Sequence, residues 1–253
     1  CYYLNTCGKA QGKQVTAERL KSGEMAKLLQ GDRTENVWGQ TLGTDTIPQP
    51  TTDATKRVYE VKFTYNGEVK ATRYATNGQS IHGGLPTFTA KDLLGSSYNA
   101  HHYYTIAFAD NFSTATTVTA DRQVAISFTE KDCYEITSKA DWKTFSDLVN
   151  NKGMNGLNAK LTQDVDLGSE IVMAGTENPD PFSYDDFLYY TGTFDGQGHT
   201  LKFNWNAGKD DRIAPFWCVK DATIKNLRTQ GKITSRDGQY LSGLVGRVRG
   251  ANR

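Results

Sequence analysis

The feature that most constrains the fold is a series of short apolar segments that recur about every twenty residues near the end of the chain. They centre on Leu201, Ile224 and Leu244, so successive centres are 23 and 20 residues apart. Gly and Asn residues, which favour turns, lie between the segments. This period is typical of a solenoid in which each coil covers the apolar edge of its neighbour. The pattern predicts a right-handed parallel β-helix with the three residues stacked in one column.

An amphipathic helix is predicted over residues 138–153, just before these strands. Ser138 with Asp141 three residues later resembles a capping box, with Asp in place of the usual Glu. The spacing of four apolar residues places them on one face of this helix: Trp142, Phe145, Leu148 and Val149.

Two further blocks precede this helix. Residues 1–55 contain one predicted helix, which Thr16 caps and Gly31 ends, followed by a short strand and a linker rich in Pro and Thr. Residues 56–131 alternate apolar and polar side chains on both sides of Asn66-Gly67, which predicts a hairpin in a small β-rich module. The chain is therefore expected to be mainly β, with blocks at 1–55, 56–131 and 132–253.

Charge and hydropathy argue against two classes of partner. The 29 basic and 28 acidic residues are spread along the chain, which gives no reason to expect nucleic acid or an anionic membrane as a partner. No apolar run approaches the roughly 18 residues of a membrane-spanning helix. Because the chain begins at Cys1 without a Met or a signal peptide, we interpret it as mature or as a fragment.

The cysteines and histidines do not form a metal-binding pattern, and no cofactor motif is present. Either Cys1 and Cys7 pair, or the cysteines are small buried apolar residues, which is the favoured interpretation. The residues concerned are Cys1, Cys7, Cys133, Cys218, His82, His101, His102 and His199. The adjacent His101 and His102 should point to opposite faces of a strand, so we expect no shared ion.

The chain contains two kinds of acidic site. Asp195 lies in a Gly-rich turn, where an Asp side chain commonly accepts backbone N–H groups, so a structural role is favoured over catalysis. The pairs Asp185-Asp186 and Asp210-Asp211 lie in loops, which carry function more often. The first of these loops is also rich in aromatic rings, which either stack on sugars or cap the apolar core. No catalytic or metal-binding residue is predicted, and the candidate ligand-binding residues are Tyr184, Asp185, Asp186, Tyr189 and Tyr190.

Several stretches occur in the order typical of the GLUG-repeat β-helix proteins of bacterial surfaces. These are LNAKLTQDVDL, YTGTFDGQGHTLKFNW, APFWCVKDATIKNLRTQGKI and YLSGLVGRV. The segment SGLVGRV matches the Gly-Leu-x-Gly motif that names the repeat. Residues 132–253 therefore resemble the start of a GLUG-type β-helix with an N-terminal capping helix. The pattern is interrupted at Arg253, so the natural protein is expected to continue.

The other two blocks also resemble parts of large surface proteins of the Bacteroidetes. Residues 1–55 are similar to the helix-plus-strand segment that closes a preceding β-helix. Residues 56–131 are similar to the Listeria–Bacteroides repeat, a β-grasp-like module, but they contain the insertion KDLLGSSYNAHHYY and lack the usual Gly-Trp. This order implies a slice through a tandem array.

The resemblance implies a non-catalytic segment of a large secreted or cell-surface bacterial repeat protein. Such a segment is expected to act as a stalk or adhesin, with host or microbial glycans or surface proteins as ligands. The alternative is part of a carbohydrate-active β-helix enzyme, a polysaccharide lyase or glycoside hydrolase, whose catalytic residues lie outside this segment. Because function is assigned here by fold-level analogy, the site itself has to be argued from its own geometry.

Overall fold

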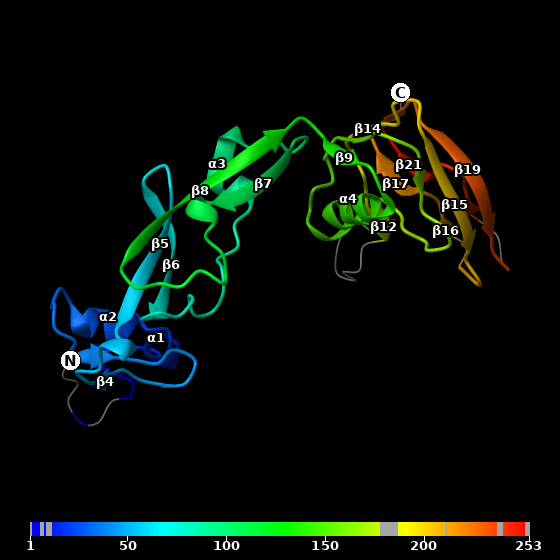
Figure 1. Ribbon diagram of the computed structural model, residues 1–253. Helices are drawn as coiled ribbons and strands as arrows, with labels where there is room; N and C mark the ends of the chain where they lie inside the picture. The colour runs from blue at the N-terminus through cyan, green and yellow to red at the C-terminus, as the bar shows by residue number, and fades with distance from the viewer. Residues whose placement is uncertain are drawn as a thin grey trace. The chain divides into compact units, whose positions relative to one another are not determined.

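The computed structural model (Figure 1) describes residues 2–5, 8, 12–177, 187–210, 212–236 and 240–250. The chain is mainly β, which confirms the predicted fold class at that level. It divides into two compact units. The N-terminal unit comprises residues 1–96 and 105–129, and the C-terminal unit comprises residues 97–104 and 130–253. None of the described helices is long and apolar enough to span a membrane.

The N-terminal unit begins with short strands and a pair of helices. The elements are β1 (Tyr2–Tyr3), β2 (Lys13–Gln14), α1 (Ala17–Lys21), α2 (Glu24–Gln30), β3 (Trp38–Gly39), β4 (Gln49–Pro50) and the 3₁₀ turn η1 (Ala54–Lys56). Strands β1 and β2 pair in parallel, and β3 and β4 pair antiparallel.

The single helix predicted in this region is wrong, because the structure breaks it at Gly23. Gly23 has φ 93°, and a Cβ there would lie 2.9 Å from the Cβ of Tyr74. The close approach of strand β6 therefore requires Gly and ends α1 before α2 begins. Thr16 caps α1 as predicted, its Oγ1 accepting from the backbone N–H of Arg19 at 3.3 Å. Leu28 on α2 is 52% exposed.

The rest of the unit is a four-stranded sheet with short helical segments. Its elements are β5 (Val58–Tyr65), β6 (Glu68–Thr76), α3 (Ala90–Leu94), η2 (Gly95–Ser97), β7 (Tyr103–Phe108), η3 (Ala109–Asn111) and β8 (Arg122–Lys131). The strand order is β6-β5-β8-β7, with β5 antiparallel to β6 and parallel to β8. The predicted hairpin is confirmed, and Asn66 and Gly67 both have positive φ in its turn. Phe63 and Val61 are fully buried in the core of this sheet.

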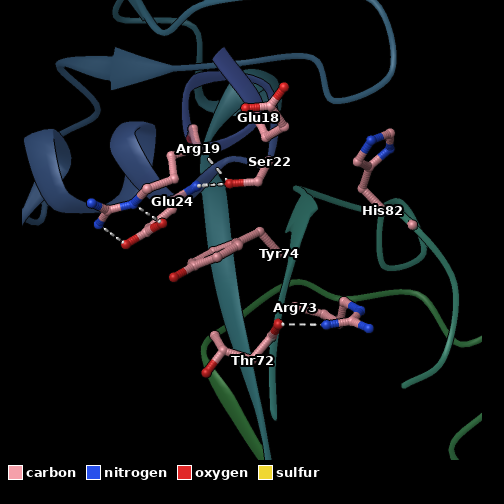
Figure 2. Close-up of a pocket in the computed structure, with 9 residues that line it drawn as sticks. Glu18, Arg19, Ser22, Glu24, Thr72, Arg73, Tyr74 and His82 are labelled. Carbon is pink, nitrogen blue, oxygen red and sulfur yellow. Dashed lines mark hydrogen bonds and ion pairs between the residues drawn. The ribbon is translucent and has the colours of Figure 1, made fainter. Parts of the chain in front are cut away.

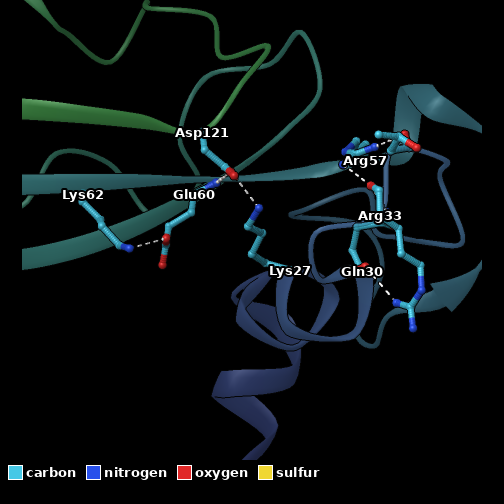
Figure 3. Close-up of polar contacts among 8 residues, drawn as sticks. Lys27, Gln30, Arg33, Arg57, Glu60, Lys62 and Asp121 are labelled. Atoms are coloured by element: carbon cyan, nitrogen blue, oxygen red, sulfur yellow. Dashed lines mark hydrogen bonds and ion pairs between the residues drawn. The ribbon is translucent and has the colours of Figure 1, made fainter.

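Polar contacts join the first 55 residues to the sheet within one unit. Asp121 accepts from the backbone N–H of Glu60 at 2.8 Å and from the ammonium group of Lys27 on α2 (Figure 3). The buried hydroxyl of Thr76 donates to the Gln40 carbonyl at 2.9 Å and accepts from the Leu42 N–H at 2.9 Å. The two Thr76 bonds are buried, so they fix the segment around Gln40 and Leu42 against β6. The Asp121 contacts, which are exposed, add a link between α2 and β5.

The C-terminal unit consists of one helix, α4 (Lys139–Asn151), and several ladders of short parallel strands. The strands are β9 (Tyr134–Ile136), β10 (Ala159–Leu161), β11 (Val165–Asp166), β12 (Thr176–Glu177), β13 (Phe187–Leu188), β14 (Thr193–Asp195), β15 (Thr200–Asn206), β16 (Arg212–Ile213), β17 (Phe216–Lys220), β18 (Thr223–Lys225), β19 (Arg228–Thr234), β20 (Tyr240–Leu241) and β21 (Val245–Arg249).

Four of its sheets are parallel. Their orders are β18-β14-β10-β9, β11-β15-β19, β16-β20 and β17-β21. Strands β12 and β13 form a separate antiparallel pair.

The predicted column of Leu201, Ile224 and Leu244 is wrong. Ile224 pairs with Phe194 in the first ladder, Leu201 pairs with Val165 in the second, and Leu244 immediately precedes β21 in another. The spacing of 20–23 residues leads from one ladder to another. Residues within one ladder are separated by a longer interval, as from 159 to 194 or from 194 to 224.

Helix α4 covers the ladders with a face of large rings. Trp142 and Phe145 are fully buried, and the indole N–H of Trp142 donates to the Val172 carbonyl at 2.9 Å. The predicted capping box is confirmed, since Ser138 Oγ accepts from the Asp141 N–H at 3.2 Å and Asp141 accepts from the Thr137 N–H at 3.0 Å. The helix therefore begins where the sequence predicts and supplies a large part of the core.

We predict that Gly231→Ala destabilises the C-terminal unit by about 1–3 kcal/mol, because an added methyl would overpack the ladder. Gly231 pairs with Phe203, has φ 148°, and would place a Cβ 1.7 Å from the Phe203 carbonyl oxygen. Thermal unfolding followed by circular dichroism measures the effect. The control is Gly243→Ala, whose Cβ would find its nearest neighbour at 3.8 Å and should change stability by no more than about 0.5 kcal/mol. Equal behaviour of the two variants would contradict the β15–β19 register.

Candidate functional site

The predicted ligand-binding loop is only partly described. Tyr184, Asp185 and Asp186 lie outside the described residues. Tyr189 and Tyr190 are 5% and 0% exposed, and the Tyr190 hydroxyl donates to the Leu157 carbonyl at 3.0 Å. Burial raises the pKa of the Tyr190 phenol well above its ordinary value. Both rings are core residues in the structure and offer no open face to a ligand.

Asp195 holds a corner of the stacked strands. Its Oδ1 accepts from the Gln197 N–H at 2.9 Å and from the side-chain amide of Asn226, which directly follows β18, at 3.1 Å. The hydrogen bond from the Gln197 backbone is the largest cause that holds the pKa of Asp195 below its ordinary value. The neighbouring Gly196 is needed because a Cβ would lie 2.4 Å from the Leu227 Cα. These contacts support the structural role predicted for this aspartate.

The two adjacent histidines have different partners. A ring nitrogen of His101 lies 2.7 Å from the Gly156 carbonyl, and one of His102 lies 2.6 Å from the Glu130 carboxylate. Within the described ranges, no three His, Cys, Asp or Glu side chains come together as metal ligands.

Two of the four cysteines are described. Cys133 and Cys218 are free thiols, whereas Cys1 and Cys7 lie outside the described residues. Cys218 is buried, and its burial raises the pKa of the thiol to about 12. It therefore behaves as a small apolar core residue at neutral pH.

The main hollow of the N-terminal unit lies between the helix pair and strand β6 and has a volume of about 580 Å³ (Figure 2). Strand β6 is the edge strand of its sheet. The side chains that line the hollow are polar or charged almost throughout: Glu18, Arg19, Ser22, Glu24, Thr72, Arg73, Tyr74 and His82, with Gly83. This site has no signature in the sequence, because its residues come from separate segments with no common motif.

Arg73 is oriented by its own backbone surroundings. Its Nε donates to the Gly84 carbonyl at 3.2 Å, and Nη1 donates to the Thr72 carbonyl at 3.0 Å. Among the described residues it pairs with no carboxylate, in contrast to Arg19. Figure 2 shows Arg73 on the side of β6 that faces His82, and Thr72 and Tyr74 on the other side. The guanidinium group is thus held in place with donor capacity left over.

Tyr74 lies beside the ion pair that Arg19 and Glu24 form with each other. Arg19 and Glu24 form two contacts, one of them 2.7 Å from Nε to Oε2. The bond to Arg19 holds the pKa of the Glu24 carboxyl below its ordinary value of 4.5. Burial raises the pKa of the Tyr74 phenol to about 12, so the hydroxyl stays protonated. It donates to no other residue that the structure describes.

A second hollow, of about 360 Å³, lies in the C-terminal unit beside β13. Phe187, Trp217 and Tyr240 line it together with Arg247, whose guanidinium carbon lies 4.1 Å from the centroid of the Phe187 ring. Tyr240 is 57% exposed, so this hollow carries the open aromatic surface that Tyr189 and Tyr190 lack.

The chain matches no protein-family model, no curated protein and no solved structure. The candidate sites therefore rest on their own geometry.

We predict that Glu24→Gln lowers the thermal midpoint of the N-terminal unit by about 2–4 °C near pH 7, through loss of the ion pair with Arg19. Because folding lowers the Glu24 pKa, this stabilisation is present above 4.5 and is lost as the pH falls through the lower, folded value. The difference from the parent should therefore shrink near pH 3.

Thermal scans at both pH values test this, with Glu35→Gln as the control. Glu35 is exposed and makes no side-chain ion pair with the residues described, so its replacement should have little effect at either pH. A Glu24→Gln effect that persisted undiminished in acid would show that the ion pair is not its cause.

Proposed function

We propose that this chain is a non-catalytic segment of a secreted or cell-surface bacterial repeat protein, which acts as a stalk or adhesin. In this proposal, residues 132–253 begin a right-handed parallel β-helix of the GLUG type. The observation that carries it is the set of parallel ladders, in which Tyr134, Ala159, Phe194 and Ile224 follow one another in register. Stacked coils of this kind form a stiff support by repetition, with each coil contacting its neighbours.

The Gly-Leu-x-Gly motif also has a physical reason within such a stack. Gly246 follows Leu244 by two positions, and a Cβ there would lie 2.1 Å from the indole Cε3 of Trp217 on the preceding coil. Gly at this position lets the two coils approach closely over the flat ring. This contact supports the assignment of SGLVGRV to a repeating coil.

The N-terminal unit fits the same proposal. The parallel pairing of β1 and β2 supports a closing segment of a preceding β-helix in residues 1–55. The order β6-β5-β8-β7, with β5 parallel to β8, supports a β-grasp-like spacer in residues 56–131. In this proposal the spacer separates two β-helices, and the polar hollow beside β6 provides a surface for ligands.

We expect the parent protein to lie on the outer face of the bacterial cell or in the medium. The test is labelling of intact cells with an antibody raised against this chain, with a cytoplasmic protein as the control. Loss of the signal after brief protease treatment of whole cells is the expected result.

Signal only after cell lysis would contradict the proposed location. Turnover of any polysaccharide by the purified chain would contradict the non-catalytic role and favour a carbohydrate-active enzyme. The two results are distinguishable, because the first concerns location and the second concerns chemistry.

A further inference from the structure

We propose that the hollow beside β6 binds a carboxylate-bearing sugar, of the uronic acid class, with the acid group on Arg73. The inference does not depend on the proposed β-helix, because every lining residue belongs to the N-terminal unit. The volume of about 580 Å³ lies within the range of about 300–1,000 Å³ typical of small-molecule sites.

The hydrogen bonds and charge of Arg73 indicate that the ligand carries an anionic group. Two backbone carbonyls hold its Nε and Nη1, which leaves Nη2 and the outer edge of the guanidinium group for a ligand. Guanidinium groups bind carboxylates through paired, charge-assisted hydrogen bonds. Among the residues described, Arg19 already has Glu24 as its partner and Arg73 has no carboxylate, so Arg73 is the cation of this hollow that can receive an anion.

The sugar-like remainder follows from the other lining groups. The Tyr74 ring packs against Ala26, Leu42 and Val58, which fixes its position, and its hydroxyl is a protonated donor without a described partner. Thr72 adds a hydroxyl group, and the exposed Glu18 adds an acceptor. The Ser22 hydroxyl already donates to the Arg19 carbonyl at 3.0 Å and accepts from the Glu24 N–H at 3.2 Å, so it contributes to the shape of the hollow. Aromatic rings with hydroxyl and carboxylate groups around them suit a ring that carries several hydroxyls. A purely apolar ligand would leave these groups desolvated and unpaired.

The position of the hollow indicates an oligosaccharide rather than a single sugar. Arg73 and Tyr74 are neighbours on an edge strand and point to opposite sides of it (Figure 2). The His82 N–H donates to the Tyr74 carbonyl at 2.8 Å, so residues 82–84 run along this edge. A ligand that reaches both side chains must therefore pass around this segment, which requires more than one ring. Successive side chains of a strand point to opposite faces, so the contact of a ligand with Arg73 and its contact with Tyr74 lie on opposite sides of β6.

The experiment is an amide chemical-shift titration of the full chain with trigalacturonate and, separately, with the neutral galactose trisaccharide. We expect trigalacturonate to shift residues 72–74 and 82–83 in a saturable manner, and the neutral sugar to bind at least about tenfold more weakly. Equal affinity for the two sugars would overturn the role of Arg73. No shift with trigalacturonate would overturn the proposal.

Two variants and a matched control separate binding from folding. Arg73→Gln should weaken trigalacturonate at least about tenfold, and Tyr74→Phe, which removes only the hydroxyl, should weaken it severalfold. Arg228→Gln removes the same charge from an exposed strand of the C-terminal unit and should bind like the parent. If Arg73→Gln lost dispersed shifts throughout the unit, Tyr74→Phe would decide the outcome. Parental binding by a folded Arg73→Gln or by Tyr74→Phe would overturn the assignment.

A short peptide with a free C-terminal carboxylate, and the same peptide as its amide, test the protein alternative. Shifts at residues 72–74 with the acid peptide alone, without any response to trigalacturonate, would overturn the sugar assignment in favour of a peptide ligand. A response to sodium sulfate equal to that of trigalacturonate would also overturn it, because Arg73 would then be a general anion site.

Discussion

The burial of large rings between stacked strands is the constraint on which the C-terminal unit depends. The Phe194 ring centroid lies 5.8 Å from that of Trp142 on α4 and 4.9 Å from that of Phe216 on β17. Three elements that are distant in sequence therefore meet at one ring. Side chains alternate along a strand, so a slip of one residue in β14 would turn Phe194 away from both partners. The backbone hydrogen bonds of such short strands define the register only weakly. The packing of the ring cluster therefore sets it.

The features that the sequence predicted correctly are those determined within a few residues. The hairpin at Asn66-Gly67 needs only two residues with positive φ, and the cap of α4 needs only Ser138 and Asp141. The break at Gly23 was not predictable, because its cause is Tyr74, about fifty positions further along the chain. The predicted column failed for a related reason. A spacing near twenty residues fits both two neighbouring strands of one ladder and the step from one ladder to another, and periodicity alone does not separate the two cases.

The candidate site shows the same limit. Tyr189 and Tyr190 looked like exposed ligand residues because they follow a loop rich in aromatic and acidic residues. In the structure Tyr190 enters the main core and Tyr189 enters a separate cluster with Trp217 and Cys218, so both side chains are covered. The residues that cover Tyr189 belong to β17, more than twenty positions later in the chain. No sequence pattern pointed to Arg73, since Glu24 and His82 share no motif with it. These residues come together only because β6 pairs with β5 and packs against the helix pair.

The edge position of β6 connects stability with recognition. An edge strand must resist pairing with other chains, and charged side chains along it serve that purpose. On β6 these are Glu68, Lys70 and Arg73, of which the first two neutralise each other at 2.7 Å. Arg73 is held instead by carbonyl groups, so its charge stays available beside the hollow. The His82 N–H covers the Tyr74 carbonyl on the same edge at 2.8 Å. The arrangement that protects this edge from a neighbouring strand therefore leaves the Arg73 guanidinium group available to a small anionic ligand.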